Sequence, residues 1–536
     1  MNIVGFVDFY VEIRIEESRD MLALMLNALG GGSVGEGMVL AKYYAFVDDC
    51  GVVKEADNAF YLFRDPMGLQ PVFYTIVGSR VVFASAIRAL FSYPGVEAVL
   101  DINGLGELIA LGPARYEHSG VFKGIHALPP GYFLRIERGQ PLNSIKGEKY
   151  WDFPARFHVH SEEETIANVR KLLRDAILSR LRVDDSICSL LSGGLDSSIV
   201  TAVIAEEYRK TGRPLRTFSF DFTNSAEHFK SNAFQPDRDR PWIDKMVEFC
   251  KTSHEYLECG PEDLVNSLYA AVDARDLPGM ADIDASLLYF CSKIPKDIGT
   301  VFTGECADEI FGGYPWFHKE LEEGTNQFPW SRDFETRRAF LKDEWIEALK
   351  LEAVSAEYCQ KTISEAPLEE SLSRRGYLTL KWFMPTLIER MGRMGGYSGL
   401  KAEVPFADVK LMEYVWNVPW ALKCKNGTVK YVLREAAKGI VPEEVLLRKK
   451  SPFPKTYDPA YTALLAERLT DVLSNPAAPV RMFVDLKKAE KFITAMIKEP
   501  NVSRPWYGQL MAGPQMMAYV LQLDYWLRKY RVSCRF

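Results

Sequence analysis

A short loop of glycines and serines between a strand and a helix constrains this chain more than any other feature. Residues 187–191 read Ile-Cys-Ser-Leu-Leu, an apolar run that is typical of a buried parallel strand. The loop Ser-Gly-Gly-Leu-Asp-Ser-Ser follows at 192–198, and the apolar pattern then predicts a helix over 199–208. A second strand is predicted over 215–220. This order of strand, loop, helix and strand begins a doubly wound α/β sheet.

The loop has the chemistry of a phosphate-binding turn. Gly193 and Gly194 permit a tight turn and let the backbone approach an anion closely. The first N–H groups of the next helix have no helical partner and lie at the positive end of its dipole. Hydroxyl groups are supplied by Ser192, Ser197 and Ser198. The alternative is a capped turn that binds no ligand. A string this long between a strand and a helix makes that alternative the weaker interpretation.

Asp196 lies within the same loop, where a carboxylate would repel a bare phosphate. We therefore interpret Asp196 as a ligand of Mg²⁺. A second loop, residues 303–314, follows a strand predicted over 299–303 and should reach the same carboxyl edge of the sheet. Its carboxylates would repel one another unless a cation or a proton separated them. We predict that Asp308 is a second Mg²⁺ ligand and Glu305 a general base or proton shuttle; an acidic helix start is the alternative.

Two basic segments follow further along the chain. The run Arg448-Lys449-Lys450 precedes a proline-stiffened loop and could reach a pyrophosphate, but its spacing alone favours an ordinary surface position. Lys430 and Arg434 lie four residues apart, so we expect them on one solvated helical face.

The rest of the chain predicts two domains. An α+β domain over residues 1–155 has strands expected at 3–10, 60–63, 71–77, 81–84 and 132–136, and a helix at 17–29. The domain over 156–536 begins with a helix expected at 162–181, has a loop at 224–241, and is mainly helical from Phe334.

Composition excludes several classes of protein. The 65 basic and 72 acidic residues give a net charge of −7, which argues against a nucleic-acid partner. The nine cysteines form no Cys-x-x-Cys pair, which disfavours zinc and fits reduced thiols in a cytoplasm. We find neither a basic signal-peptide start nor an apolar run of about 18 residues, so we expect a cytoplasmic protein without a membrane span.

Taken together, these motifs resemble the asparagine synthetase family, within the PP-loop ATP pyrophosphatases, over nearly the whole chain. The resemblance rests on residues 190–198, 303–314, 404–406 with 408, 427–430 with 433–434, 450–452, 64–71 and 122–125 with 128–131. It implies an N-terminal Ntn-hydrolase-like glutaminase domain. It also implies a C-terminal ATP pyrophosphatase domain with a doubly wound parallel sheet and a helical extension.

The resemblance also implies roles for individual residues, with ATP and Mg²⁺ as cofactors. The adenosine of ATP would contact Leu191, Phe220, Thr303 and Gly304. The pyrophosphate would contact Ser192, Gly193, Gly194, Asp196, Ser197 and Ser198. Asp196 and Asp308 would bind Mg²⁺, Glu305 would transfer protons, and Lys450 would stabilise negative charge during adenylation. A carboxylate and ATP would give an acyl-adenylate and pyrophosphate, and an amine would then displace AMP.

Two departures from the family pattern affect substrates. Glutaminases of the family begin Met-Cys-Gly-Ile with a nucleophilic cysteine, whereas this sequence begins Met-Asn-Ile-Val-Gly, has no cysteine before Cys50 and lacks the Asn-Gly-Glu-Ile-Tyr loop. Before Val-Pro-Phe, the usual Glu-x-Arg reads Lys401-Ala402-Glu403. This paired reversal either preserves a salt bridge or changes the substrate pocket.

The leading hypothesis is an amide ligase that makes asparagine from aspartate and ammonia. A second is an amide- or lactam-forming synthetase of peptide or antibiotic biosynthesis, and a third is a non-catalytic regulatory partner. All three leave open a homodimer or a separate glutaminase as partner.

We predict that the N-terminal domain does not hydrolyse glutamine, because the amide of Asn2 is no nucleophile. Purified protein supplied with glutamine should release no glutamate above a protein-free blank, with an authentic glutaminase as positive control. Steady glutamate release that saturates with glutamine would contradict this expectation.

Overall fold

The computed structural model describes residues 4–6, 44–47, 51–56, 59–78, 80–137, 140–182, 186–229, 231, 237–318, 326–368, 370–499 and 504–536. The chain divides into two compact units. The first comprises residues 1–107, 115–153 and 530–536, and the second comprises 108–114 and 154–529. The division was expected after residue 155; in the structure residues 108–114 and 154–155 belong to the second unit, and residues 530–536 belong to the first.

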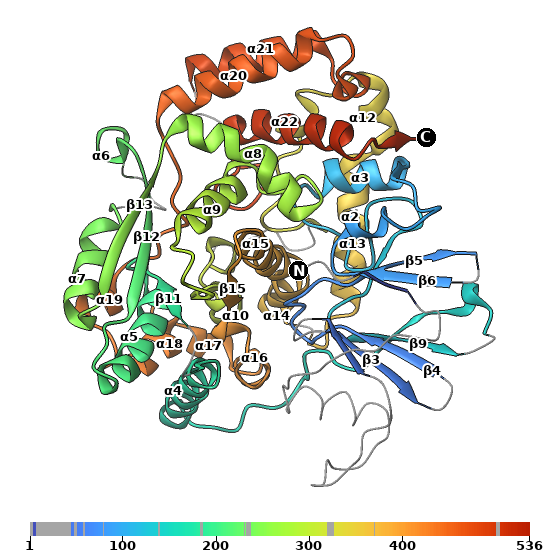
Figure 1. The fold of residues 1–536 in the computed structure, drawn as a ribbon. Coiled ribbons are helices and arrows are strands. Elements are labelled where there is room, and N and C mark those ends of the chain that lie inside the picture. The colour runs from blue at the N-terminus through green and yellow to red at the C-terminus, as the bar shows by residue number, and fades with distance from the viewer. Residues whose placement is uncertain are drawn as a thin grey trace. The chain divides into compact units, whose positions relative to one another are not determined.

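The first unit contains two antiparallel sheets (Figure 1). One has the order β1 (Val4–Phe6), β6 (Arg80–Ala84), β5 (Phe73–Val77) and β8 (His126–Ala127). The other has the order β10 (Gly147–Lys149), β9 (Tyr132–Glu137), β4 (Ala59–Phe63), β3 (Gly51–Ala56) and β2 (Tyr44–Val47). The helices α2 (Ile87–Leu90) and α3 (Ile102–Ala110) follow β6, and β18 (Ser533–Cys534) pairs in parallel with β7 (Val99–Leu100).

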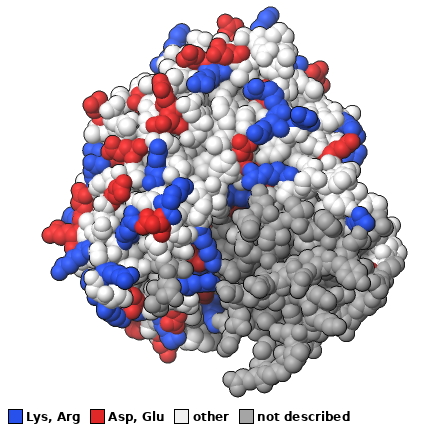
Figure 2. All heavy atoms as spheres, viewed as in Figure 1, with Lys and Arg blue, Asp and Glu red and all other residues white. Residues whose placement is uncertain are grey.

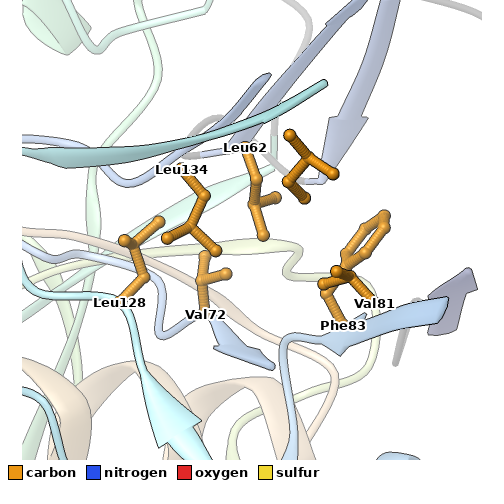
Figure 3. Close-up of a cluster of buried hydrophobic side chains, with 7 residues drawn as sticks. Leu62, Val72, Val81, Phe83, Leu128 and Leu134 are labelled. Atoms are coloured by element: carbon orange, nitrogen blue, oxygen red, sulfur yellow. The ribbon is translucent and has the colours of Figure 1, made fainter. Parts of the chain in front are cut away.

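The two sheets bury apolar side chains against each other (Figure 3). Leu62 of β4 and Leu134 of β9 are paired in register and fully buried. Val81 and Phe83 approach from β6, and Val72, Leu128 and Ile136 complete the cluster. Alternate residues of each strand point to the same face, which is why residues two apart supply this core.

The strands expected at 60–63, 71–77, 81–84 and 132–136 are confirmed within two residues at either end. The helix expected at 17–29 lies outside the described residues. Helix α3 was not expected, because Gly104 and Gly106 weaken a helical pattern. A side chain at Gly104 would meet the carbonyl oxygen of Val121 at 2.1 Å, so tertiary packing requires glycine there.

The second unit is built on a five-stranded parallel sheet. Its order is β13 (Ser253–Cys259), β12 (Arg216–Phe222), β11 (Ile187–Leu190), β14 (Thr300–Phe302) and β15 (Lys401–Glu403). From β11 the chain adds strands in one direction and then returns to add β14 and β15 on the other side. The order therefore reverses between β11 and β14, and in such sheets ligands bind at that point, beyond the carboxyl ends of the strands. The expected doubly wound sheet is confirmed.

Helices cover this sheet and extend the unit (Figure 1). Those before β15 are α4 (Glu162–Leu178), α5 (Leu195–Lys210), α6 (Ser225–His228), α7 (Arg240–Cys250), α8 (Pro261–Arg275), α9 (Asp282–Lys293), α10 (Ala307–Phe311), α11 (Glu335–Arg338), α12 (Asp343–Leu349), α13 (Leu351–Ser364), α14 (Ser371–Leu378) and α15 (Met384–Tyr397), with a π-helical turn at Thr379–Phe383. Those after it are α16 (Val409–Trp416), α17 (Trp420–Lys423), α18 (Tyr431–Ala436), α19 (Glu443–Leu447), α20 (Pro459–Ser474), α21 (Leu486–Lys498) and α22 (Gly513–Lys529). The small hairpin β16 (Cys424–Lys425) and β17 (Thr428–Val429) precedes α18. The mainly helical region expected from Phe334 is confirmed.

Three boundaries differ from the expectations. Helix α4 ends at Leu178 rather than at 181, and α5 begins at Leu195, inside the expected loop. The loop expected at 224–241 contains α6 and the first two residues of α7. None of the helices among the described residues has the length and apolarity to cross a membrane. Basic and acidic side chains are interspersed over the described part of the face in Figure 2.

The buried leucine of β4 gives a test of the first unit. Leu62→Ala should lower the free energy of unfolding of this unit by about 2–5 kcal/mol, because it leaves a cavity among fully enclosed neighbours. Hydrogen exchange of the β4 and β9 amides measures this locally. Ile76→Ala in β5, where the side chain is 38% exposed, is the matched control and should change little. Equal losses from both substitutions would contradict the assigned core.

Candidate active site

Two loops meet where the strand order reverses. The glycine loop joins β11 to α5, and the acidic loop joins β14 to α10. A side chain on Gly304 would come within 2.6 Å of the backbone nitrogen of Ser197 and 2.8 Å of the carbonyl carbon of Asp196. Only glycine permits this approach, so the acidic loop packs directly on the first turn of α5.

Close packing against α7 and a pair of hydroxyl groups hold the glycine loop in place at the start of α5. Gly193 has φ +66°, and a side chain there would lie 2.7 Å from Cβ of Trp242 in α7. The Oγ atoms of Ser192 and Ser197 are 2.9 Å apart, which ties the two ends of the loop together. Gly194 is the N-cap of α5 and supplies no side-chain cap. The first N–H groups of α5 are therefore available to an anion.

The structure brings the two predicted magnesium ligands together. The Nζ atom of Lys430 lies 2.8 and 2.7 Å from the two carboxylate oxygens of Asp196, and 2.5 Å from Oδ1 of Asp308. The ammonium of Lys450 contacts the other oxygen of Asp308. A side chain on Gly313 would meet Oδ1 of Asp308 at 1.9 Å, so glycine makes room for that carboxylate. Carboxylate oxygens that converge on one cation are the donors that Mg²⁺ prefers, and these residues fit it.

Burial and mutual charge shift the pKa values of this cluster. Burial alone would raise the pKa of Asp308, but Lys430 and Lys450 outweigh it and lower that pKa to about 2. Burial raises the pKa of Asp196, assisted by Asp308 and opposed by Lys430. Burial would lower the pKa of Lys430, but the two carboxylates raise it. Asp308 therefore carries a negative charge, and Lys430 a positive one, at neutral pH.

The expected solvated position of Lys430 was wrong. Helix α18 begins only at Tyr431, and Lys430 precedes it in the left-handed conformation, with φ +59° and 3% exposure. Arg434 was expected beside it on a solvated face and is instead half-buried, donating from Nε to the carbonyl oxygen of Val429 at 2.8 Å. The spacing of Lys430 and Arg434 was interpreted as helical, and this interpretation fails because the chain turns at Lys430. The sequence signal that pointed to a role for Lys430 was its position at the end of the motif 427–430.

The expected surface position of the basic run was also wrong for two of its three residues. Arg448 is 6% exposed, pairs with Asp239 and donates from Nη1 to the carbonyl oxygen of Ser192 at 3.1 Å. Lys450 is half-buried against Asp308, and only Lys449 is exposed.

The remaining carboxylates of the acidic loop are buried. The Nη2 atom of Arg390 donates to Oε1 of Glu305 at 2.5 Å, and Oε2 of Glu305 is buried without a hydrogen-bond partner among the described residues. Burial raises the pKa of Glu305, although Arg390 opposes this. Glu309 accepts a hydrogen bond of 2.6 Å from the hydroxyl of Tyr314. Burial, with the nearby charge of Asp308, raises the pKa of Glu309 to about 7.

These residues surround a cavity of about 230 Å³. The sequence-predicted residues that line it are Leu191, Ser192, Gly194, Asp196, Ser197, Phe220, Thr303, Gly304, Glu305, Asp308 and Lys450. Gly193 and Ser198 lie behind the lining, with Gly193 against α7 and Ser198 fully buried in α5. The apolar part of the wall includes Met280, Leu287, Phe383, Leu387, Met391 and Phe453.

The reversed charges before Val-Pro-Phe lie apart from this lining. Lys401 and Glu403 contact each other at 3.4 Å on β15, and Glu403 lies 3.6 Å from Arg180 of the segment after α4. Neither residue lines the cavity. This geometry favours the salt-bridge interpretation over a changed pocket.

Comparisons with known proteins agree with this geometry. The family model for asparagine synthase matches residues 168–528, and the model for a glutamine amidotransferase domain matches 39–151. The chain is 40% identical over 516 residues to glutamine-hydrolyzing asparagine synthetase 3 of Bacillus subtilis, covering 92% of this chain and 82% of that protein. It is 28% identical to glutamine-hydrolyzing asparagine synthetase 1 of Bacillus subtilis, over 74% of this chain and 66% of that protein. It is 25% identical to amidase chyE of Penicillium rubens, over 80% and 74%.

Gly193 offers a test of the loop. Gly193→Ala should weaken ATP binding by about tenfold or more, because a methyl group would push the loop away from α7 and strain the backbone. Gly212→Ala is the matched control, since Gly212 has φ +74° at the end of α5 but nothing within 4 Å of an added Cβ. Titration calorimetry with ATP and Mg²⁺ measures both. Equal weakening in the two variants would contradict a nucleotide site at this loop.

Proposed function

Since the chain belongs to the asparagine synthase family of ATP-dependent amide ligases, we propose that it adenylates aspartate and transfers ammonia to give asparagine, AMP and pyrophosphate. The observation that carries the adenylation step is the convergence of Asp196 and Asp308 on one cation position beside the glycine loop. Lys450 reaches the same Asp308, so a cationic side chain stands next to the proposed phosphate site.

In this proposal the chain holds the nucleotide through charges and donors that are already placed. The N–H groups at the start of α5 and the hydroxyls of Ser192 and Ser197 face the pyrophosphate. Asp196 and Asp308 would hold Mg²⁺, which would supply shielding of the phosphate charge and polarisation of the reacting phosphoryl group. Lys430 and Lys450 stabilise the charge that accumulates as the substrate carboxylate attacks the α-phosphorus and pyrophosphate leaves.

Amide formation requires that a proton leave the attacking nitrogen. Glu305 lines the cavity, and Arg390 fixes one of its oxygens, while the other has no hydrogen-bond partner in the part of the chain that the structure describes. We assign this second oxygen as the proton acceptor, and AMP leaves as the amide forms. Burial keeps the basicity of Glu305 above that of an ordinary carboxylate.

Aspartate as substrate and ammonia as donor are the finer parts of the proposal. The relative that is 40% identical is named as an asparagine synthetase, which supports aspartate. That name also specifies glutamine hydrolysis, whereas the sequence lacks the Asn-Gly-Glu-Ile-Tyr loop with which glutaminases of the family bind glutamine. We therefore propose free ammonia as the nitrogen source for this chain.

A second candidate keeps the adenylation chemistry with a larger, less polar acid. The apolar wall formed by Phe383, Leu387, Met391 and Phe453 favours it, since aspartate has little apolar surface to bury there. In that case the product is an amide or lactam of peptide or antibiotic biosynthesis.

Product analysis distinguishes these functions. The protein with ATP, Mg²⁺ and aspartate should form AMP, pyrophosphate and asparagine when ammonia is supplied, and not when glutamine replaces it. Lys450→Ala should reduce the rate by about 10²–10³-fold, because a preorganised charge is lost from the transition state. Lys171→Ala, whose side chain is 73% exposed on α4, is the matched control and should retain the full rate.

Two outcomes would contradict the proposal, one in its acid substrate and the other in its nitrogen donor. AMP formation with another acid but not with aspartate would replace the substrate and favour the second candidate. Asparagine formation from glutamine at the rate seen with ammonia would replace the nitrogen donor.

A further inference from the structure

We propose that Arg448 and Asp239 are positioning residues that fix the distance between the glycine loop and Lys450. Neither residue was singled out for this by the sequence, and the proposed catalytic steps do not use them. The inference rests on the proposed function in one respect, namely that Lys450 acts in adenylation.

Arg448 connects the relevant elements through a single side chain. One guanidinium nitrogen donates to the carbonyl oxygen of Ser192 at 3.1 Å, and another contacts Asp239, which directly precedes α7. The guanidinium carbon lies 5.2 Å from the ring centre of Trp242. The same Trp242 lies against Gly193, so Arg448 and α7 both contact the glycine loop.

Asp239 holds the chain on both sides of Lys450. Its Oδ1 atom accepts from Arg448 and, at 3.1 Å, from the hydroxyl of Ser451. The residues between these contacts are Lys449 and Lys450. Arg434 of α18 fixes the start of the segment, because it donates to the carbonyl oxygen of Leu446 and, at 3.1 Å, to that of Arg448.

These contacts replace the regular structure that the segment lacks. Residues 448–458 contain no helix or strand, so no backbone ladder determines where Lys450 lies. A lysine side chain has considerable rotamer freedom, and small errors in the position of a catalytic charge reduce rates strongly. The side chains of Arg448 and Asp239 are 4% and 12% exposed, so solvent screens their attraction little.

A cycle of substitutions separates positioning from a merely structural role. The assay is aspartate-dependent exchange of pyrophosphate into ATP at saturating ATP, with the Kd for ATP measured separately. Arg448→Lys keeps the charge but cannot replace the planar guanidinium that reaches Ser192, Asp239 and Trp242 at once. We expect its exchange rate to fall by about 10- to 100-fold while the Kd for ATP changes less than about threefold.

The decisive variant is the double substitution of Arg448→Lys with Lys450→Ala. If Arg448 acts through Lys450, the double variant should exchange pyrophosphate at the rate of Lys450→Ala alone, within about twofold. The Asp239→Asn variant, combined in the same way, gives an independent cycle that keeps the shape of the side chain should Arg448→Lys fail to fold. The exposed pair Arg216 and Asp297 supplies matched controls, and Arg216→Lys and Asp297→Asn should both exchange at the unaltered rate.

Two results would overturn the inference while leaving the proposed function intact. One is a double variant whose loss equals the product of the single losses, which marks a structural role. The other is an increase in the Kd for ATP as large as the loss in rate, which assigns Arg448 to nucleotide binding. An unaltered rate in Lys450→Ala alone would overturn the catalytic role of Lys450, and the positioning role with it.

Discussion

The placement of Asp196 and Asp308 around Lys430 is the constraint on which the rest of the second unit depends. Two carboxylates at the end of a buried sheet cannot remain ionised without cations close by, because removing charge from water is costly. The chain supplies these cations from residues 430 and 450, more than a hundred residues after Asp308. The left-handed turn at Lys430 and the absence of a side chain at Gly313 both serve this contact.

The sheet makes the contact possible. Because the strand order reverses between β11 and β14, the two loops that leave these strands emerge side by side without a covering helix between them. Gly304 then lets the acidic loop approach the first turn of α5 closely enough for both carboxylates to share one ammonium. The ion pair therefore depends on both the strand order and Gly304, and the cavity lies beside it.

Distance along the chain decides which parts of the site could be predicted from the sequence and which could not. The glycine loop and the acidic loop were predicted because each contains its strand end, turn and polar groups within a few residues. Lys430 and Arg448 were assigned to the surface because their partners lie 234 and 256 residues away. A buried cation whose partner is distant has the same local signature as an exposed one. Helix α3 was missed for a related reason, since only the contact with Val121 explains the glycine that weakens its pattern.

The charges of six side chains at the phosphate end of the cavity support the proposal that a divalent cation binds together with the nucleotide. Three acids, Asp196, Asp239 and Asp308, face three bases, Lys430, Arg448 and Lys450, so the cluster is close to neutral by itself. These six charges already pair with one another, so none of the six is free to balance the negative charge that a triphosphate entering alone would add. Mg²⁺ held by Asp196 and Asp308 would supply that balance, and it would release Lys430 and Lys450 to contact phosphate oxygens. Asp196 and Asp308 balance the charge of these lysines. In this proposal the same two carboxylates would couple the binding of the metal to the binding of ATP.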